Sequence, residues 1–176
     1  NIRAAIAVGN IFGVSTRLMR QALQSFRPLP HRLEFVGEFR GIKFYNDSLA
    51  TIPEATIHAL ESLGDDVATL IAGGFDRGLD YAELGKFLAH RPSLTTLILF
   101  PDTGEKIWAA MLSSDPSIEK GITKYEIRTM EEAVALAYQH TPAGKICLLS
   151  PGAASFNLFR DYAERGETFK TLVCRT

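Results

Sequence analysis

Three short segments of this 176-residue chain combine residue types that could bind a small anion. In the first, residues 150–155, an apolar run over 146–149 ends in small residues, and a helical pattern begins around 159–162. A strand followed by such a turn and a helix leaves backbone N–H groups and a serine hydroxyl free at the carboxyl edge of a sheet. Open α/β folds bind ligands at this edge, so the segment predicts an anion site.

The second segment, residues 46–51, follows an apolar run that ends at Tyr45, and it contains Asp47 and Thr51. These two side chains could contact a ligand. A turn that also caps a helix expected from Pro53 explains the same residues. Taken alone, the segment favours the turn and the cap over the ligand site.

The third segment, residues 73–78, contains Gly73 and Gly74, which allow the backbone to approach a ligand closely. It also contains Arg77, whose planar guanidinium suits a carboxylate or a phosphate. A surface salt bridge from Arg77 to Asp76 or Asp80 is an equal alternative. The three segments together support an anion site better than any one of them does.

Strands and helices are expected to alternate around these segments. Strands are expected at residues 33–36, 42–45, 67–72, 96–100, 124–127 and 146–149, and helices at 53–62, 81–89, 104–112 and 130–138. The first two strands should form a hairpin through residues 37–41. The remaining order predicts an α/β fold, a Rossmann-like and mostly parallel sheet with helices on both faces. All three segments follow strands, where such sheets place their functional loops.

The first 29 residues are expected to be organised differently. An apolar face predicts a helix that Gly13 ends, and Ser15 suits the N-cap of a second helix that runs to about Phe26. Pro28 and Pro30 then break the pattern, so we expect a domain boundary between a helical tail, residues 1–29, and a second domain, residues 30–176. Since the chain begins without Met inside a helical pattern, it is interpreted as part of a longer protein.

Composition argues against several classes of function. A formal net charge of -1 and 46% hydrophobic residues give no indication of nucleic-acid binding. No apolar run approaches the ~20 residues of a membrane-spanning helix, and the start lacks the layout of a signal peptide. Cys147 and Cys174 are the only cysteines, and neither a disulfide nor a thiolate metal site is expected. A Walker loop is absent, so the chain alone cannot form a P-loop nucleotide site.

Arg32 opens the second part of the chain, directly after the expected hinge. It could reach across the hinge to a bound phosphate, or it could be solvated at the start of a strand. His31, beside a proline, is interpreted as structural. His58, His90 and His140 have no neighbours in the sequence that indicate chemistry, so no metal site is predicted.

Five motifs resemble, in order and spacing, those of the Mur ligase family, and within it those of the ligases that join D-glutamate to UDP-N-acetylmuramoyl-L-alanine. They are Pro30-His31-Arg32-Leu33-Glu34, Asn46-Asp47-Ser48-x-Ala50-Thr51, Gly73-Gly74, Leu149-Ser150-Pro151-x-Ala153-Ala154-Ser155 and Phe159-x-x-Tyr162-x-x-Arg165-Gly166-x-x-Phe169. The resemblance runs over nearly the whole chain, and five motifs in the same order are hard to produce by chance.

The resemblance implies that residues 1–29 end the family's central ATPase domain and that residues 30–176 form its carboxy-terminal, glutamate-binding domain. It implies a cytoplasmic, monomeric, ADP-forming ligase of peptidoglycan synthesis, and hence of cell wall biogenesis, cell shape and cell division. Its partners would be glutamate, UDP-N-acetylmuramoyl-L-alanine and ATP with Mg²⁺, without nucleic acid or membrane insertion. ATP would phosphorylate the alanyl carboxylate, and the glutamate amine would attack the acyl phosphate, so the protein has to position groups and neutralise charge. The chain alone is expected to be inactive.

The resemblance also implies roles for single residues, none of them catalytic with confidence. Asn1, Arg32 and Asp47 would contact the nucleotide; Thr51, Arg77 and Ser155 would hold the carboxylates of glutamate; Phe156 and Tyr162 would form the walls of that pocket.

The chain departs from the family pattern at four positions. The family usually has lysine where Leu49 and Arg77 stand, asparagine where Ala4 stands and phenylalanine where Tyr162 stands. The first two changes alter charge or reach beside the expected site. The choice between D- and L-glutamate therefore stays open. A sister ligase that adds a different amino acid, and a non-catalytic α/β module that binds an anion or a protein, are further alternatives.

Overall fold

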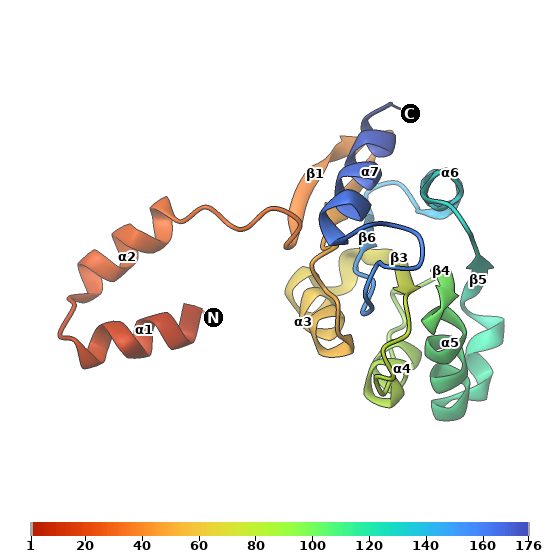
Figure 1. The fold of residues 1–176 in the computed structure, drawn as a ribbon, viewed down its shortest axis with the longest axis horizontal. Helices are drawn as coiled ribbons and strands as arrows, with labels where there is room; N and C mark the ends of the chain where they lie inside the picture. The colour runs from red at the N-terminus through yellow and green to blue at the C-terminus, as the bar shows by residue number, and fades with distance from the viewer. Residues whose placement is uncertain (1, 176) are drawn as a thin grey trace.

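The computed structural model of the protein describes residues 2–175 and confirms the α/β architecture (Figure 1). Its helices are α1 (Ile2–Ile11), α2 (Thr16–Ser25), α3 (Pro53–Leu63), α4 (Ala82–Ala89), α5 (Thr103–Ser114), α6 (Met130–His140) and α7 (Tyr162–Arg175). Its strands are β1 (Glu34–Phe39), β2 (Ile42–Asn46), β3 (Val67–Gly74), β4 (Thr96–Asp102), β5 (Thr123–Glu126) and β6 (Ile146–Leu149). Every strand expected from the sequence forms, with small shifts at the ends.

The strands form one sheet in the order β1-β2-β6-β3-β4-β5. β1 and β2 form the expected antiparallel hairpin, and the other neighbouring pairs are parallel. β6 lies between β2 and β3, where Leu149 pairs with Asn46 on one side and with Ile71 on the other. Three adjacent strands therefore end at the same sheet edge, and each is followed by one of the three segments that could bind an anion.

Helices cover both faces of the sheet because successive strand residues point to opposite sides. Leu70 and Leu148 pack in a core with α3, α4 and α5. Their neighbours Ile71 and Leu149 pack in a second core with α6 and α7, on the other side of the sheet (Figure 1). All residues of β3 and β6 are buried, which explains why these strands are mostly apolar, with Thr69 as the one hydroxyl-bearing residue of β3.

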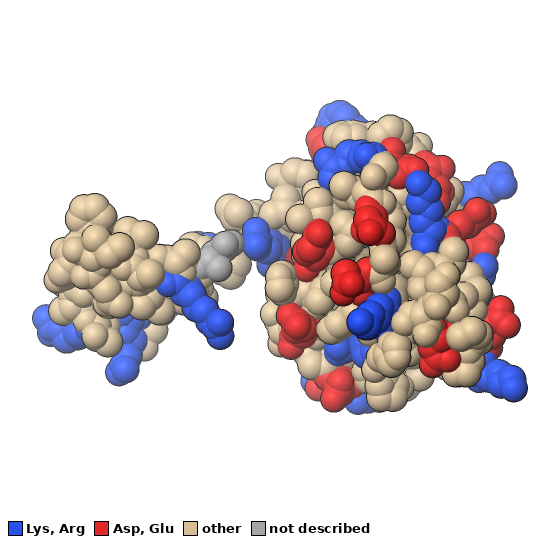
Figure 2. Space-filling model, turned by 90° about the horizontal axis from the view of Figure 1, so that it is seen from below, with Lys and Arg blue, Asp and Glu red and all other residues tan. Residues whose placement is uncertain are grey.

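The two helices expected before the sheet form, and the side chain of Ser15 caps α2 by accepting a hydrogen bond from the Leu18 backbone N–H. Neither helix contains a buried residue. Figure 1 shows them to one side of the sheet, joined to it by an extended segment. This part of the chain carries arginines and no acidic residue up to Leu33, and Figure 2 shows blue but no red on it. The domain boundary near residue 29 stays a prediction.

The helix expected around residues 159–162 begins only at Tyr162, and residues 156–161 form turns. Asp161 Oδ1 accepts the Glu164 backbone N–H at 2.8 Å, as an N-cap does. Residues 156–161 separate the turn 150–155 from α7, whose start at Tyr162 lies within the range that the sequence predicted. Within residues 2–175, no helix is long and apolar enough to cross a membrane.

Candidate functional site

The loop after β3 is bonded to the turn after β6. The Gly73 backbone N–H donates to the Pro151 carbonyl oxygen at 2.8 Å, and the Phe75 backbone N–H donates to the Ala154 carbonyl oxygen at 2.9 Å. Gly74 permits this approach, because a Cβ built on it would lie 2.3 Å from the Ala154 carbonyl oxygen. The backbones of these two loops therefore run in direct contact, which only glycine allows at position 74.

Arg77 joins the same loop to the loop after β2, since its Nη2 donates to the Thr51 carbonyl oxygen at 2.9 Å. Asp76 instead pairs with Lys106 at 2.5 Å, and the hydrogen bond from Lys106 lowers the pKa of Asp76. Asp80 accepts a backbone N–H at the start of α4. Among the described residues Arg77 forms no ion pair with either carboxylate, so the surface salt bridge is wrong.

The loop after β2 forms a turn, in which the Ala50 backbone N–H donates to the Asp47 carbonyl oxygen at 2.9 Å. It does not cap α3. The N-cap of that helix is Ile52, whose side chain makes no capping hydrogen bond, and Pro53 occupies the first turn. The capping interpretation of Asp47 and Thr51 is therefore wrong, and these side chains serve some other purpose.

Asp47 is buried at the centre of this loop, with 5% of its surface exposed. Its Oδ1 accepts the Leu33 backbone N–H at 3.0 Å, and its Oδ2 accepts a hydrogen bond from Ser150 Oγ at 2.8 Å. Burial raises the pKa of Asp47 to about 6, although both hydrogen bonds and the charge of Arg32 oppose the change. The carboxylate is thus mostly ionised at neutral pH.

Arg32 and Asp47 line the same hollow of about 440 Å³ beside α3. Leu49 lies on its wall, where the family usually has lysine, so the hollow has an apolar side next to a cation and a carboxylate. This mixture suits a ligand with an apolar ring and polar substituents. Asn1, also expected to contact the nucleotide, lies outside the described residues, and Ala4 is exposed on α1.

Ser155, Phe156 and Tyr162 lie around the turn after β6. Ser155 is buried, directly after the Ala154 carbonyl that bonds to the β3 loop. Phe156 is 63% exposed, and its ring meets Phe75 edge to face, with centroids 6.1 Å apart. The ring of Tyr162 stands edge-on to His31 at 6.0 Å. The roles of these three residues in a glutamate pocket stay predictions.

Arg165 lies next to the loops of the candidate site, and the sequence analysis assigned it no role. Its side chain is 1% exposed, and it donates to Oγ and the carbonyl oxygen of Ser48 at 3.0 and 2.9 Å. It also donates to the carbonyl oxygens of Ala153 and Ala154 at 3.1 and 3.3 Å. Burial lowers the pKa of Arg165 to about 9, so it keeps its charge at neutral pH. A signal existed, because Arg165 lies four residues before the buried Phe169 on one helix face.

His31 is structural, as expected. It is 6% exposed, its Nδ1 lies 2.9 Å from Asn46 Nδ2, and it packs on Gly166, where a Cβ would lie 2.3 Å from Nδ1. Within residues 2–175 no group of three or more His, Cys, Asp or Glu side chains could hold a metal ion.

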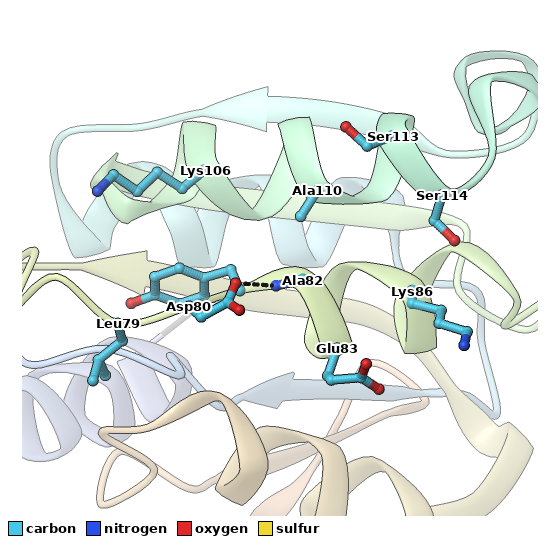
Figure 3. A pocket seen from close by; sticks show the side chains of 10 residues that line it. Leu79, Asp80, Ala82, Glu83, Lys86, Lys106, Ala110, Ser113 and Ser114 are labelled. Carbon is cyan, nitrogen blue, oxygen red and sulfur yellow. Dashed lines mark hydrogen bonds between the residues drawn. The ribbon is translucent and has the colours of Figure 1, made fainter.

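A second hollow, of about 510 Å³, lies between α4 and α5 (Figure 3). Figure 3 shows Lys106, Ser113 and Ser114 on the α5 side and Glu83 and Lys86 on the α4 side. None of the residues expected to bind glutamate or a nucleotide lines it. The loops at the sheet edge therefore form the candidate site.

Known proteins with similar sequences and folds identify the family. Residues 31–152 match the family described as "Mur ligase, glutamate ligase domain". The UDP-N-acetylmuramoylalanine--D-glutamate ligases of Aquifex aeolicus and Roseiflexus sp. are 38% and 40% identical to this chain, each over 98% of it. The chain covers 40% and 36% of those two proteins, so it spans about two fifths of the length of such relatives.

Solved structures of lower identity share the fold. A UDP-N-acetylmuramate-alanine ligase of Thermotoga maritima superposes with a TM-score of 0.60 at 16% identity, over 96% of this chain and 35% of its own. MurF of Acinetobacter baumannii gives a TM-score of 0.60 at 18% identity, over 99% of this chain and 37% of its own. The domain match over residues 31–152 and the relatives of 38% and 40% identity show that the chain belongs to the Mur ligase family.

Proposed function

We propose that this chain is the glutamate-presenting part of a longer ATP-dependent ligase that joins glutamate to UDP-N-acetylmuramoyl-L-alanine in peptidoglycan precursor synthesis. D-glutamate is the proposed enantiomer, because the relatives that match nearly the whole chain are named D-glutamate ligases. The ligase would act in the cytoplasm as a monomer.

The contact between Arg77 and Thr51 is the observation that carries this proposal. It joins two of the three residues expected to hold glutamate, and the loop that contains Arg77 is hydrogen-bonded to Ala154, next to the third, Ser155. One permanent cation beside two hydroxyls is a suitable donor set for two carboxylates on one small molecule. The carbonyl oxygen of Ser155 accepts the backbone N–H groups of Leu158 and Phe159, and its hydroxyl would donate to the ligand.

The hollow lined by Arg32 and Asp47 supports a place for ATP on the other side of the same loop. Arg32 would neutralise phosphate charge, and the ionised Asp47 would accept hydrogen bonds from a nucleotide hydroxyl or from a water on Mg²⁺. Bound Mg²⁺ would screen the phosphates while the acyl phosphate forms. Asp47, between the nucleotide and the turn after β6, would keep ATP and glutamate in a fixed relation.

Ligation by the full-length protein tests the proposal. ADP release is measured with UDP-N-acetylmuramoyl-L-alanine and either D- or L-glutamate, for the wild type and for Arg77→Ala. Since Arg77 would hold a carboxylate, the variant should raise KM for glutamate at least tenfold and leave KM for ATP within threefold. Arg175→Ala, at the exposed end of α7, is the matched control and should change neither constant.

The outcomes separate the alternatives. Ligation with L-glutamate alone would assign the L-specific branch, and absence of ADP release with both enantiomers would refute a glutamate ligase and leave the sister ligase and the non-catalytic module. An unchanged KM for glutamate in Arg77→Ala would remove Arg77 from the pocket.

A further inference from the structure

We propose that Arg165 is a positioning residue that locks the loop after β2 to the turn after β6 and thereby sets the length of amino acid that the site accepts. The inference rests on the proposed function, because Thr51 lies on the first loop and Ser155 on the second. Arg165 itself lies beneath both and would touch no substrate.

The hydrogen bonds of Arg165 divide evenly between the two loops. Ser48 in the loop after β2 accepts two, and Ala153 and Ala154 in the turn after β6 accept one each. Ser48 lies three residues before Thr51, and Ala154 lies directly before Ser155. A planar guanidinium offers its donors at fixed angles, so it holds its acceptors at one separation.

This buried cation has no carboxylate partner among the described residues, because all its hydrogen bonds end on a hydroxyl or on carbonyl oxygens. An unpaired buried charge is unfavourable for folding compared with an apolar side chain of similar size. Stability alone does not explain an arginine here. An arginine is explained by its four hydrogen bonds, which hold two loops together, and by its positive charge next to the proposed anion site.

Arg165 and the Phe75 backbone N–H together hold the Ala154–Ser155 peptide in one orientation. No cis peptide bond occurs in residues 2–175, and in a trans peptide the C=O and the N–H point in opposite directions. The Ala154 carbonyl points to Arg165 and Phe75, so the Ser155 N–H points the opposite way. The Ser155 N–H is thus a donor whose orientation Arg165 helps to hold.

Arg165→Lys in the full-length ligase tests this inference, with Arg91→Lys as the matched control. Arg91 also holds carbonyl oxygens, those of Leu60 and Gly64, and its side chain is 9% exposed, but it lies at the other end of the sheet. Lysine keeps the positive charge but lacks the planar guanidinium with its fixed donor directions, so the substitution tests geometry separately from charge. Both variants are compared with the wild type for kinetics, melting temperature and hydrogen–deuterium exchange.

The kinetic readout is discrimination by length, measured as kcat/KM for aspartate, glutamate and 2-aminoadipate in the enantiomer that the wild type uses. Arg165→Lys should raise KM for glutamate at least tenfold and reduce the preference for glutamate over its shorter and longer homologues at least fivefold. KM for ATP should change less than threefold. Arg91→Lys should have a lower melting temperature than the wild type, with the wild-type KM for glutamate and the wild-type preference for glutamate.

Hydrogen–deuterium exchange gives a readout that needs no activity. Peptides covering residues 46–51 and 150–155 should both exchange faster in Arg165→Lys and stay as in the wild type in Arg91→Lys. Unchanged exchange in a folded Arg165→Lys, or equal kinetic changes in the two variants, would overturn the inference. If the wild type ligates no amino acid while exchange changes as described, the proposed function fails and the lock between the loops stands.

Discussion

Replacing Asp47 by asparagine should stabilise the protein at neutral pH. Burial raises the pKa of this carboxyl from 3.8 to about 6 in the folded state, so between these two pH values the folded protein holds a proton that the unfolded chain has released. The stability that this proton provides is fully present below pH 3.8 and is lost as the pH rises through about 6. Each unit of the pKa difference between the folded and unfolded states corresponds to about 1.4 kcal/mol. The shift from 3.8 to about 6 therefore lowers the free energy of unfolding at neutral pH by about 3 kcal/mol.

Asparagine fits the same hydrogen bonds without a charge. Its amide oxygen can accept the Leu33 backbone N–H, as Oδ1 of Asp47 does. Its NH₂ group can donate to Ser150 Oγ, which lies 3.1 Å from Thr56 Oγ1 and can then donate to that hydroxyl. The substitution therefore removes the unfavourable buried charge and leaves no polar atom of this network without a partner.

Urea denaturation of the wild type and Asp47→Asn at pH 4 and pH 7.5 measures the effect. The stability difference in favour of the variant should grow by about 2 to 3 kcal/mol between the two pH values. Asp66→Asn, which removes an exposed ion pair with Lys145, is the control and should stay within about 0.5 kcal/mol of the wild type. A difference between Asp47→Asn and the wild type that is equal at both pH values would refute the reasoning.

Three further outcomes are expected. Thr129→Ala removes the side chain that caps α6, and it should lower the free energy of unfolding by about 1 kcal/mol in urea. Gly85→Ala places a Cβ 2.4 Å from that of Ala110; crowding between α4 and α5 should lower the free energy of unfolding by about 1 to 3 kcal/mol without changing KM for glutamate. Mass spectrometry after thiol labelling should find exposed Cys174 modified in the native protein and Cys147, buried and with a raised pKa, only after unfolding.

The elements were predictable because local patterns specify them. The run from Val67 to Ala72 is apolar except for Thr69, as expected for a strand buried on both faces, and β3 has this environment. Ser15 and Gly13 marked the ends of α2 and α1 correctly. The helical pattern expected from about residues 159–162 likewise matches α7, which begins at Tyr162 after Asp161 accepts the Glu164 backbone N–H.

The assembly of the site could not be predicted in the same way. β6 follows β2 by about a hundred residues and still lies beside it, and no local pattern encodes that pairing. The bond between Arg77 and Thr51 depends on this order, since it brings the loops after β2 and β3 to the two sides of β6. The alternative of a salt bridge for Arg77 considered only carboxylates near it in the sequence, whereas Asp76 pairs with Lys106 of α5.

The separation of two buried charges argues that this edge of the sheet is shaped for ligands. Asp47 and Arg165 both lie next to Ser48 in the fold, one through the chain and one through hydrogen bonds. A fold selected for stability alone would pair them, because burying a carboxylate and a guanidinium separately is unfavourable. Instead Asp47 bonds to Leu33 and Ser150, and Arg165 bonds to carbonyl oxygens and a hydroxyl. Asp47 therefore lines the hollow that it shares with Arg32, and Arg165 lies next to the turn after β6, which agrees with the adjacent nucleotide and amino-acid sites that we propose.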